Sequence, residues 1–282
     1  MKWAALVRNE IQTERNQAFS DYLNQKGYKN TLMIEKIERE NFNAQIHSLL
    51  KKNQLIRVSN HYGEILPRLF DSQTPQVMSL GAADTVVKQG VLTILRSAQY
   101  SCCLDIFKRQ NYEVNTKKSG LVIGLGALAR YAVASLIQIG VKKISVISPH
   151  KEKAQSFIAS ILKFSFDIEI VFLSEEDILK ASNEFSVVIN TIEESEESKD
   201  LFDELQFFNF VSDHPVVWDL VLSNNQSRLL KEAMNLQFRI IDGIQFSSET
   251  DLIWSSWLID HKLDWKDYEQ TLRQKMSPPE NN

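Results

Sequence analysis

This sequence has few cysteines, no excess of positive charge and no long apolar run. The 282 residues include only two cysteines, Cys102 and Cys103, and because these are adjacent they provide neither a disulfide framework nor the ligand spacing of a metal site. The formal net charge of -4 gives no basic excess of the kind that nucleic acids or anionic membranes attract. No apolar run reaches the roughly 18 residues that cross a bilayer, and the apolar stretch at 3–7 is too short for the core of a secretory signal. We therefore expect a cytoplasmic protein without a metal, nucleic-acid or membrane partner.

What the sequence does contain is a globular composition and an alternation of strand-like and helix-like segments. With 43% hydrophobic and 24% charged residues, the chain can bury a sizeable core in one large domain or two ordinary ones. In the first hundred residues this alternation is typical of an α/β layer. The expected strands are 3–7, 31–35, 55–59, 84–87 and 91–95, and the expected helices are 16–25, 39–50 and 98–113.

The alternation becomes regular from residue 121 onward. The expected strands are 121–123, 144–148, 169–172, 187–190 and 216–220, with helices at 128–138 and 151–162 between the first three. Strands separated by helices predict a parallel sheet with right-handed crossovers. Further along, we expect the acidic run 193–200 to be a solvated surface, 251–276 to be helical and 277–282 to be a frayed tail.

A glycine-rich loop follows the first strand of this second series, where residues 122–130 read VIGLGALAR. Gly124 would permit a tight turn, Gly126 would let the backbone approach a pyrophosphate, and the small Ala129 would allow close helix–strand packing. The N-terminus of the following helix presents free N–H groups and a partial positive charge to phosphates. These features favour dinucleotide binding, although an ordinary strand–turn–helix that tolerates glycine has the same spacing.

The end of the next strand, about 20 residues further on, is where such domains select their cofactor. It reads Ser148-Pro149-His150-Lys151. This stretch has neither the acidic residue that binds the ribose 2′-hydroxyl of NAD nor the arginine that pairs with the 2′-phosphate of NADP. Ser148 and Lys151 still offer a hydroxyl and a positive charge, so NADP is slightly favoured over NAD. The alternative is that Lys151 is a solvated helix residue.

Several segments resemble the shikimate dehydrogenase family, in the family's order along the chain. They are RVSNHYGEILPRLFD at 57–71, LGAADTVVKQGVL at 80–92, the glycine loop with the helix after it, VINT at 188–191, VVWDLVLSNNQSRLLKEA at 216–233 and IIDGIQF at 240–246. The resemblance implies an α/β fold with an N-terminal substrate-binding domain at 1–105 and a Rossmann-type, doubly wound NAD(P)-binding domain at 106–243. It also implies that C-terminal helices, within 244–282, return to the first domain and that the active site lies in the cleft between the two domains.

The glycine loop and the resemblance together imply a set of cofactor-binding residues. They lie in the glycine loop, at the ends of two later strands and in the Ile-Asp-Gly turn. They are Gly124, Gly126, Ala127, Ala129, Arg130, Ser148, Lys151, Asn190, Thr191 and Gly243.

The positions that carry the family's chemistry are altered in this sequence. The family passes a hydride to NADP while a lysine and an aspartate manage the proton of a ring hydroxyl. Gly63 stands at the place of the lysine and Ala98 at the place of the aspartate. Neither side chain can donate, accept or transfer a proton. We therefore expect no shikimate oxidation by the family's mechanism, and an altered substrate is one possibility.

The implied substrate positions differ as well. The family's substrate asparagine is Asp84, whose negative charge is expected to repel a carboxylate, and its glutamine is Thr250. The family's Ser-x-Ser-Pro stretch, which binds a carboxylate, falls at 9–12 without a serine. Arg96, near the expected cleft, could bind a carboxylate in a bidentate pair. Asp84, Arg96 and Thr250 are therefore the candidate substrate-binding residues.

Two residues beside the vacant lysine place could act in proton transfer. His61 and Tyr62 adjoin Gly63, and either could serve as an acid–base group. A surface or packing role is the commoner one for single residues of these types.

Three functions remain open on this reasoning. The first is an NADP-dependent dehydrogenase of the shikimate dehydrogenase type that acts on a small cyclic hydroxy acid. The second is a catalytically inactive nucleotide-binding sensor or interaction protein. The third is a protein with an unrelated ligand and a vestigial glycine loop. Fold does not choose between them, because function depends on the site.

Overall fold

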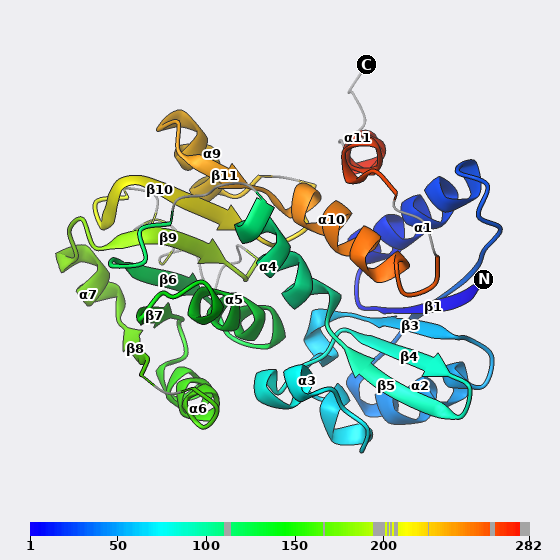
Figure 1. Cartoon of the computed structure of the whole chain (residues 1–282). Helices are drawn as coiled ribbons and strands as arrows, with labels where there is room; N and C mark the ends of the chain where they lie inside the picture. Colours follow the sequence, from blue (N-terminus) through cyan, green and yellow to red (C-terminus); the bar gives the residue numbers. More distant parts are fainter. Residues whose placement is uncertain are drawn as a thin grey trace. The chain divides into compact units, whose positions relative to one another are not determined.

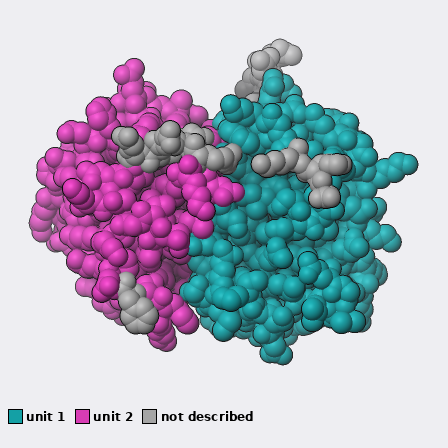
Figure 2. Space-filling view, viewed as in Figure 1, with its two compact units in different colours: residues 1–102, 247–282 teal, residues 103–246 magenta. Residues whose placement is uncertain are grey.

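The computed structural model describes residues 1–109, 114–165, 167–193, 201, 203, 205, 208–224, 226–259 and 263–276. The acidic run from 194 onward and the tail at 277–282 lie outside these residues. The chain forms two compact units, residues 1–102 with 247–282 (unit 1) and residues 103–246 (unit 2), coloured in Figure 2. The chain passes between the units within helices α4 (Ala98–Arg109) and α10 (Gly243–Ser255), and the boundaries expected at 105 and 243 fall in these same helices.

Unit 1 is built on a mixed five-stranded sheet in the order β2-β1-β3-β4-β5 (Figure 1). The strands are β1 (Lys2–Val7), β2 (Thr31–Lys36), β3 (Leu55–Val58), β4 (Thr85–Gln89) and β5 (Leu92–Arg96). The first three are parallel, since β1 pairs in parallel with both β2 and β3. β4 and β5 form an antiparallel hairpin that joins the sheet through β3.

The two faces of this sheet have separate cores. Ala4, Leu6, Ile56 and Val58 face one side, where they pack in a cluster with residues of helix α2 (Phe42–Leu50). Trp3 faces the other side and packs edge-on against Phe19 of helix α1 (Glu10–Gln25) and Trp254 of α10. The alternation of neighbouring side chains between faces is the period of two that a strand imposes.

The remaining helices of unit 1 either connect its strands or pack on helix α1. Two short 3-10 turns at Asn60–Tyr62 and Leu66–Leu69, a third at Arg39–Asn41, and helix α3 (Pro75–Leu80) connect the strands. Helix α11 (Trp265–Met276) packs on α1, with Tyr268 tilted against Phe19 and Tyr22. The C-terminal helices therefore do return to the first unit.

Unit 2 contains an entirely parallel six-stranded sheet in the order β11-β10-β9-β6-β7-β8. The strands are β6 (Ser119–Ile123), β7 (Lys143–Ile147), β8 (Glu169–Leu173), β9 (Phe185–Asn190), β10 (Val211–Asp219) and β11 (Arg239–Ile241). The helices that lie wholly within the described residues of the unit include α5 (Ala127–Gln138), α6 (Lys151–Leu162), α7 (Glu175–Lys180) and α9 (Arg228–Asn235). The chain runs outward from β6 in one direction and then outward from β9 in the other. This order is the doubly wound Rossmann arrangement, so the predicted fold class is confirmed.

Two of the sequence-based element boundaries are wrong. Helix α1 begins at Glu10 rather than at residue 16, because the side chain of Asn9 caps it by accepting a hydrogen bond from Gln12 N at 3.0 Å. Its first turn is polar, so apolar periodicity does not detect it. The single helix expected over 251–276 is interrupted, since α10 ends at Ser255 and α11 begins only at Trp265. No helix among the described residues is long and apolar enough to span a membrane.

Candidate functional site

The glycine loop of unit 2 has a backbone that other residues would not adopt. Gly124 has a φ of 106°, and a Cβ added there would collide with Ile192 and Thr191. Gly126 has a φ of 92° and is the N-cap of α5. The strand β6, the turn and the helix therefore follow one another as the motif requires, and the loop has no side chain over the N-terminus of α5 at either glycine.

The residues of α5 that follow the loop divide into packing and polar positions. Ala127 and Ala129 are buried, which agrees with the close helix–strand contact that a small residue permits. Arg130 lies with its guanidinium over the ring of Phe157 on α6, at 5.1 Å from the ring centroid. The side chain of Arg130 on α5 thus reaches the side chain of Phe157 on α6.

At the end of β7, the predicted cofactor-selecting residues lie in a turn that leads into α6. Ser148 is buried, and its Oγ accepts a hydrogen bond from the backbone N–H of His150 at 3.2 Å. Lys151 is the first residue of α6 and is exposed. Lys151 therefore offers a solvent-accessible positive charge at this edge, while the Ser148 hydroxyl accepts within its own turn.

A buried network joins the ends of β9 and β10. The carboxylate of Asp219 accepts hydrogen bonds from Asn190 Nδ2 at 3.0 Å, Val221 N at 3.1 Å and Ser227 Oγ at 2.5 Å. Burial raises the pKa of Asp219 to about 6, against the effect of these three bonds. The network fixes the segments that leave the two strands.

Three predicted cofactor-binding residues, Asn190, Thr191 and Gly243, lie in or near this network. Thr191 donates its hydroxyl to the carbonyl of Ile123 at 2.7 Å, which ties the end of β9 to the start of the glycine loop. Asn190 also donates to the carbonyl of Ile192 at 2.9 Å. Gly243 begins α10 directly against the backbone of Val221, with no room for a side chain. Asn190, Thr191 and Gly243 thus shape the carboxyl edge of the sheet in unit 2.

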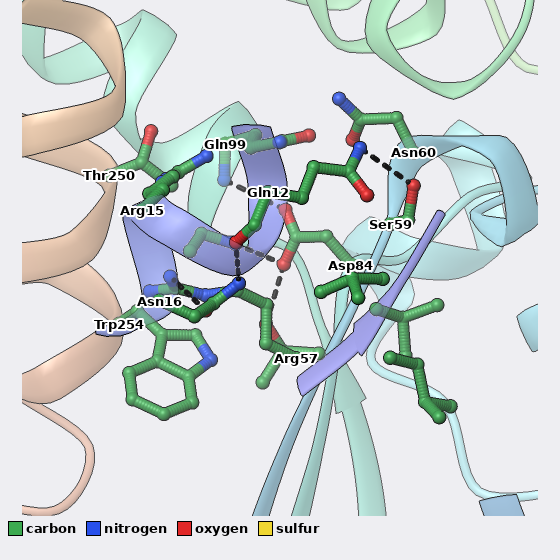
Figure 3. A pocket seen from close by; sticks show the side chains of 15 residues that line it. Gln12, Arg15, Asn16, Arg57, Ser59, Asn60, Asp84, Gln99, Thr250 and Trp254 are labelled. Carbon is green, nitrogen blue, oxygen red and sulfur yellow. Dashed lines mark hydrogen bonds between the residues drawn. The ribbon is translucent and has the colours of Figure 1, made fainter. Parts of the chain in front are cut away.

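Unit 1 contains a small polar pocket of its own (Figure 3). Its cavity volume is about 50 Å³. Polar side chains from α1, β3, the α4 N-terminus and α10 form most of its wall. The lining residues include Gln12, Arg15, Asn16, Arg57, Ser59, Asn60, Asp84, Ala98, Gln99, Thr250 and Trp254. The structure thus brings Asp84, Ala98 and Thr250, which were selected from three distant segments, into one pocket.

Asp84 is not a free carboxylate in this pocket, because it caps helix α4. Its oxygens accept hydrogen bonds from Ala98 N and Gln99 N, both at 2.9 Å, from Ser97 Oγ at 3.1 Å and from Thr85 Oγ1 at 2.6 Å. Burial raises the pKa of Asp84, while these four bonds act in the opposite direction. The carboxylate is therefore occupied by protein donors, which the sequence alone did not reveal.

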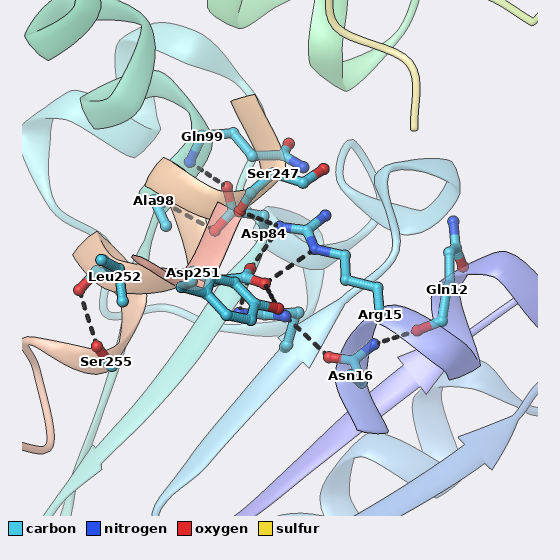
Figure 4. Close-up of polar contacts among 12 residues, drawn as sticks. Gln12, Arg15, Asn16, Asp84, Ala98, Gln99, Ser247, Asp251, Leu252 and Ser255 are labelled. Atoms are coloured by element: carbon cyan, nitrogen blue, oxygen red, sulfur yellow. Dashed lines mark hydrogen bonds and ion pairs between the residues drawn. The ribbon is translucent and has the colours of Figure 1, made fainter. Parts of the chain in front are cut away.

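A buried ionic cluster around Asp251 adjoins the pocket through Arg15 and Arg57, which line it; Figure 4 shows Arg15 against Asp251. Asp251 of α10 accepts from Arg15 Nε at 3.2 Å and from Arg15 Nη2 at 2.5 Å, and lies 2.7 Å from Arg57 Nη2. Tyr268 donates to the same carboxylate at 3.0 Å. Arg57 also stacks over Trp254, at 4.5 Å from the ring centroid. Two guanidinium groups thus share one carboxylate.

The pKa directions of the two arginines follow from this sharing. Burial opposes the charge on both, and repulsion from Arg15 further disfavours the charge on Arg57. The pKa of Arg57 is lowered, whereas Asp251 more than offsets burial at Arg15 and raises its pKa. Burial raises the pKa of Tyr268 well above its usual value, so this hydroxyl keeps its proton for Asp251.

Sequence reasoning missed this cluster, although two signals for it exist. Arg15 lies one helical turn before the buried Phe19, and so on the apolar face of α1. Arg57 interrupts the short, otherwise apolar strand β3. A charged residue on a buried face needs a partner, but nothing in the sequence pairs these residues with Asp251.

The remaining predicted residues lie outside the pocket lining. His61 Nδ1 accepts from Arg8 Nη1 at 3.0 Å, and burial with the charges of Arg8 and Arg39 lowers the pKa of His61. Tyr62 is buried, and its hydroxyl donates to the carbonyl of Ile37 at 2.5 Å. Burial raises the pKa of Tyr62 as well. Neither residue is among those that line the pocket with Asp84 and Thr250.

Arg96 lies beside a tryptophan of the same unit. Its guanidinium lies over the ring of Trp257, at 5.2 Å from the centroid, and it is not part of the pocket lining. Among the described residues, no group of three or more His, Cys, Asp or Glu side chains is placed to hold a metal ion.

Comparison with known proteins gives both sequence and structural relatives. No family model matches the chain. A shikimate dehydrogenase (NADP(+)) of Prochlorococcus marinus (strain MIT 9215) is 29% identical over 137 residues, which cover 46% of this chain and 47% of that protein. The match thus covers about half the length of this curated relative.

The structural likeness extends over nearly the whole chain. The crystal structure of shikimate 5-dehydrogenase from Thermus thermophilus, in complex with NADP(H) and shikimate, has a TM-score of 0.77 at 16% identity and covers 98% of this chain and 99% of its own. A ligand-free 5-ketofructose reductase of Gluconobacter sp. strain CHM43 has a TM-score of 0.75 at 16% identity, covering 97% and 98%. The chain is thus similar in sequence to shikimate dehydrogenases over part of its length, and it shares their fold over nearly the whole of it.

Proposed function

We propose that this protein binds NADP(H) through the glycine loop of unit 2 and is an oxidoreductase whose substrate differs from shikimate. The observation that supports this proposal most directly is a contrast between the two units. The loop at Gly124 and Gly126 has the backbone that a pyrophosphate requires, whereas the pocket of unit 1 has Ala98 at the place of the family's aspartate. Bound NADP would supply the acceptor or donor of a hydride.

The nucleotide side of the proposal rests on the chain's own residues. The backbone at Gly124 and Gly126 would hold the pyrophosphate at the N-terminus of α5. Lys151 would supply positive charge for a 2′-phosphate, which favours NADP over NAD. Asn190 and Thr191 would border the nicotinamide end, held in place by the bonds to Asp219 and Ile123. The relatives named above, which include an NADP(+) enzyme and a complex with NADP(H), support this choice.

The substrate side rests on what the pocket offers for proton transfer. Gly63 and Ala98 have no ionisable group, and the Asp84 carboxylate is occupied by four donors. His61 and Tyr62 lie outside the pocket lining. A reaction that needs a lysine–aspartate pair at a ring hydroxyl is therefore not expected, and NADP-linked assays with shikimate and quinate should give no turnover.

The nucleotide proposal is tested by titrating the chain into NADPH and following cofactor fluorescence. The wild-type chain should give a saturable change, and Gly126→Val should abolish it, because a side chain would fill the space of the pyrophosphate. Gly140→Asn is the matched control at the other end of the same helix, since Gly140 has a φ of 97° with nothing within 4 Å of an added Cβ. No change with the wild-type chain, or an equal loss in both variants, would contradict the proposal.

The alternative is a nucleotide-binding sensor without catalysis. It is favoured by the absence of an available acid–base group among the described residues of the pocket. NADPH binding without NADPH oxidation by any ketone or keto acid in a broad panel would support it. Clear turnover of shikimate would instead mean that Gly63 and Ala98 are not at the positions assigned to them.

A further inference from the structure

The hydrogen bonds of Arg15 leave part of its guanidinium available in the unit 1 pocket. Nε and Nη2 bind Asp251, and Nη2 also donates to the carbonyl of Ser247 at 3.1 Å. The third nitrogen, Nη1, makes no hydrogen bond within the part of the chain that the structure describes. Figure 4 shows this nitrogen turned away from Asp251, and Arg15 lines the pocket. A guanidinium held rigidly by a carboxylate on one side presents the N–H groups of its other side in a fixed direction.

No protein carboxylate in the pocket competes for these N–H groups. Asp251 is shared between Arg15, Arg57 and Tyr268. Asp84 accepts four hydrogen bonds from its own helix end and strand. A ligand that enters the pocket therefore meets the N–H groups of Arg15 together with one carboxylate, Asp84, whose oxygens already accept from protein donors.

The stretch at which the family resemblance places a carboxylate site is closed in this chain. Asn9 caps α1 by accepting from Gln12 N, while the side chain of Gln12 accepts from Arg8 N at 2.8 Å and donates to Ser59 Oγ at 3.1 Å. The start of α1 is thus satisfied by its own side chains. An anion in the pocket would find its donor one turn further along the helix, at Arg15.

Two unpaired acceptors in the pocket wall indicate which groups such a ligand would carry besides its anionic group. Gln99 is 8% exposed, and its Oε1 has no hydrogen-bond partner among the described residues. The same holds for Oδ1 of Asn60, which also lines the pocket. Buried acceptors without a partner are costly, and hydroxyl groups of a bound molecule are donors that would satisfy them.

We propose that Arg15 is the anion-anchoring residue of this pocket, with Nη1 donating to a carboxylate of a small hydroxylated acid whose hydroxyls bond to Gln99 and Asn60. This inference rests on the proposed function, in which the unit 1 pocket is the substrate site. It assigns specificity to a residue on α1 rather than to the altered positions Asp84 and Thr250.

The test measures binding by titration calorimetry without nucleotide, using shikimate and its methyl ester as the probes. The two molecules differ in the charge of one group and share the same hydroxyls. We expect the acid to bind the wild-type chain roughly tenfold or more tightly than the ester, because the ester lacks the charge that pairs with the guanidinium. In Arg15→Gln, the two affinities should agree within about twofold.

Two further variants distinguish the loss of the Arg15 contact from a general change in charge or in ligand binding. Lys26→Gln removes a positive charge from the same unit at its ion pair with Asp267, outside the pocket lining, and should leave the preference for the acid unchanged. Gln99→Leu should weaken both probes equally and leave their ratio unchanged. Circular dichroism checks that each variant is folded.

Several outcomes overturn the inference. They are equal binding of acid and ester to the wild-type chain, no saturable binding of the acid, or an unchanged preference in folded Arg15→Gln. The wild-type comparison needs no variant, so it can still overturn the inference if Arg15→Gln does not fold. Because no nucleotide is present, these outcomes are independent of the NADPH titration, whose failure would instead contradict the proposed function.

Discussion

Asp219 should make the stability of unit 2 depend on pH in a direction opposite to that of most carboxylates. Burial raises its pKa from 3.8 to about 6, so the folded chain binds a proton more readily than the unfolded chain. Stability from this group is therefore fully present below about pH 4 and is lost as the pH rises through about 6. At 1.36 kcal/mol for each pH unit over which the states differ by one proton, the loss is ~3 kcal/mol.

The substitution Asp219→Asn removes this titration while keeping a side chain of the same shape. The free energy of unfolding is measured by urea denaturation between pH 4 and 7.5 for the wild-type chain and the variant. From low to high pH, the wild-type chain should lose ~3 kcal/mol relative to the variant. Asp213→Asn, at an exposed carboxylate of the same strand, is the control and should follow the wild-type chain. A difference that stays constant over this range, or that favours the wild-type chain at high pH, would refute the reasoning.

Three other substitutions test single contacts through urea unfolding. Asp84→Ala leaves four buried donors without their acceptor, three at the start of α4 and Thr85 on β4, and should cost ~3 kcal/mol; a cost below about 1 kcal/mol would mean that water replaces the carboxylate. Gly243→Ala places a Cβ against the carbonyl of Val221 and should cost about 1–3 kcal/mol, whereas an unchanged stability would show that α10 can shift freely. Tyr62→Phe removes the buried bond to Ile37 and should cost about 1 kcal/mol without affecting NADPH binding; a large loss of any measured reductase activity at unchanged stability would instead support a catalytic Tyr62.

The elements predictable from the sequence are those with a strong local pattern. Strands such as β6 and β9 are continuous apolar runs next to glycine or asparagine, so their position and parallel order follow from the spacing of the segments between them. The doubly wound order is implied by the family resemblance and not by the spacing alone. The start of α1 could not, since its first turn is polar and its only local signal is the capping residue Asn9.

For the candidate site, too, the parts that are local in the sequence could be predicted and the others could not. The glycine loop is local, and the φ angles of Gly124 and Gly126 agree with the backbone that the motif predicts. The pocket of unit 1 is assembled from distant segments. The pairing of Arg15 with Asp251 crosses most of the chain, and the capping of α4 by Asp84 depends on how β4 and β5 pair. No periodicity in a single sequence carries such information, so the role of Asp84 could be read only from the fold.

The ion pair between α1 and α10 also has a consequence for how the chain is made. Unit 1 takes its residues from both ends of the sequence, whereas unit 2 is one continuous segment. During synthesis, all of unit 2 is translated before Asp251, Trp254 and Tyr268, which complete the other core. Until then, Trp3 and Phe19 lack their aromatic partners, and Arg15 and Arg57 lack their counterion. Residues 1–102 thus belong to a unit that is completed only by residues after 246, and its native contacts must close a loop that contains the whole of unit 2.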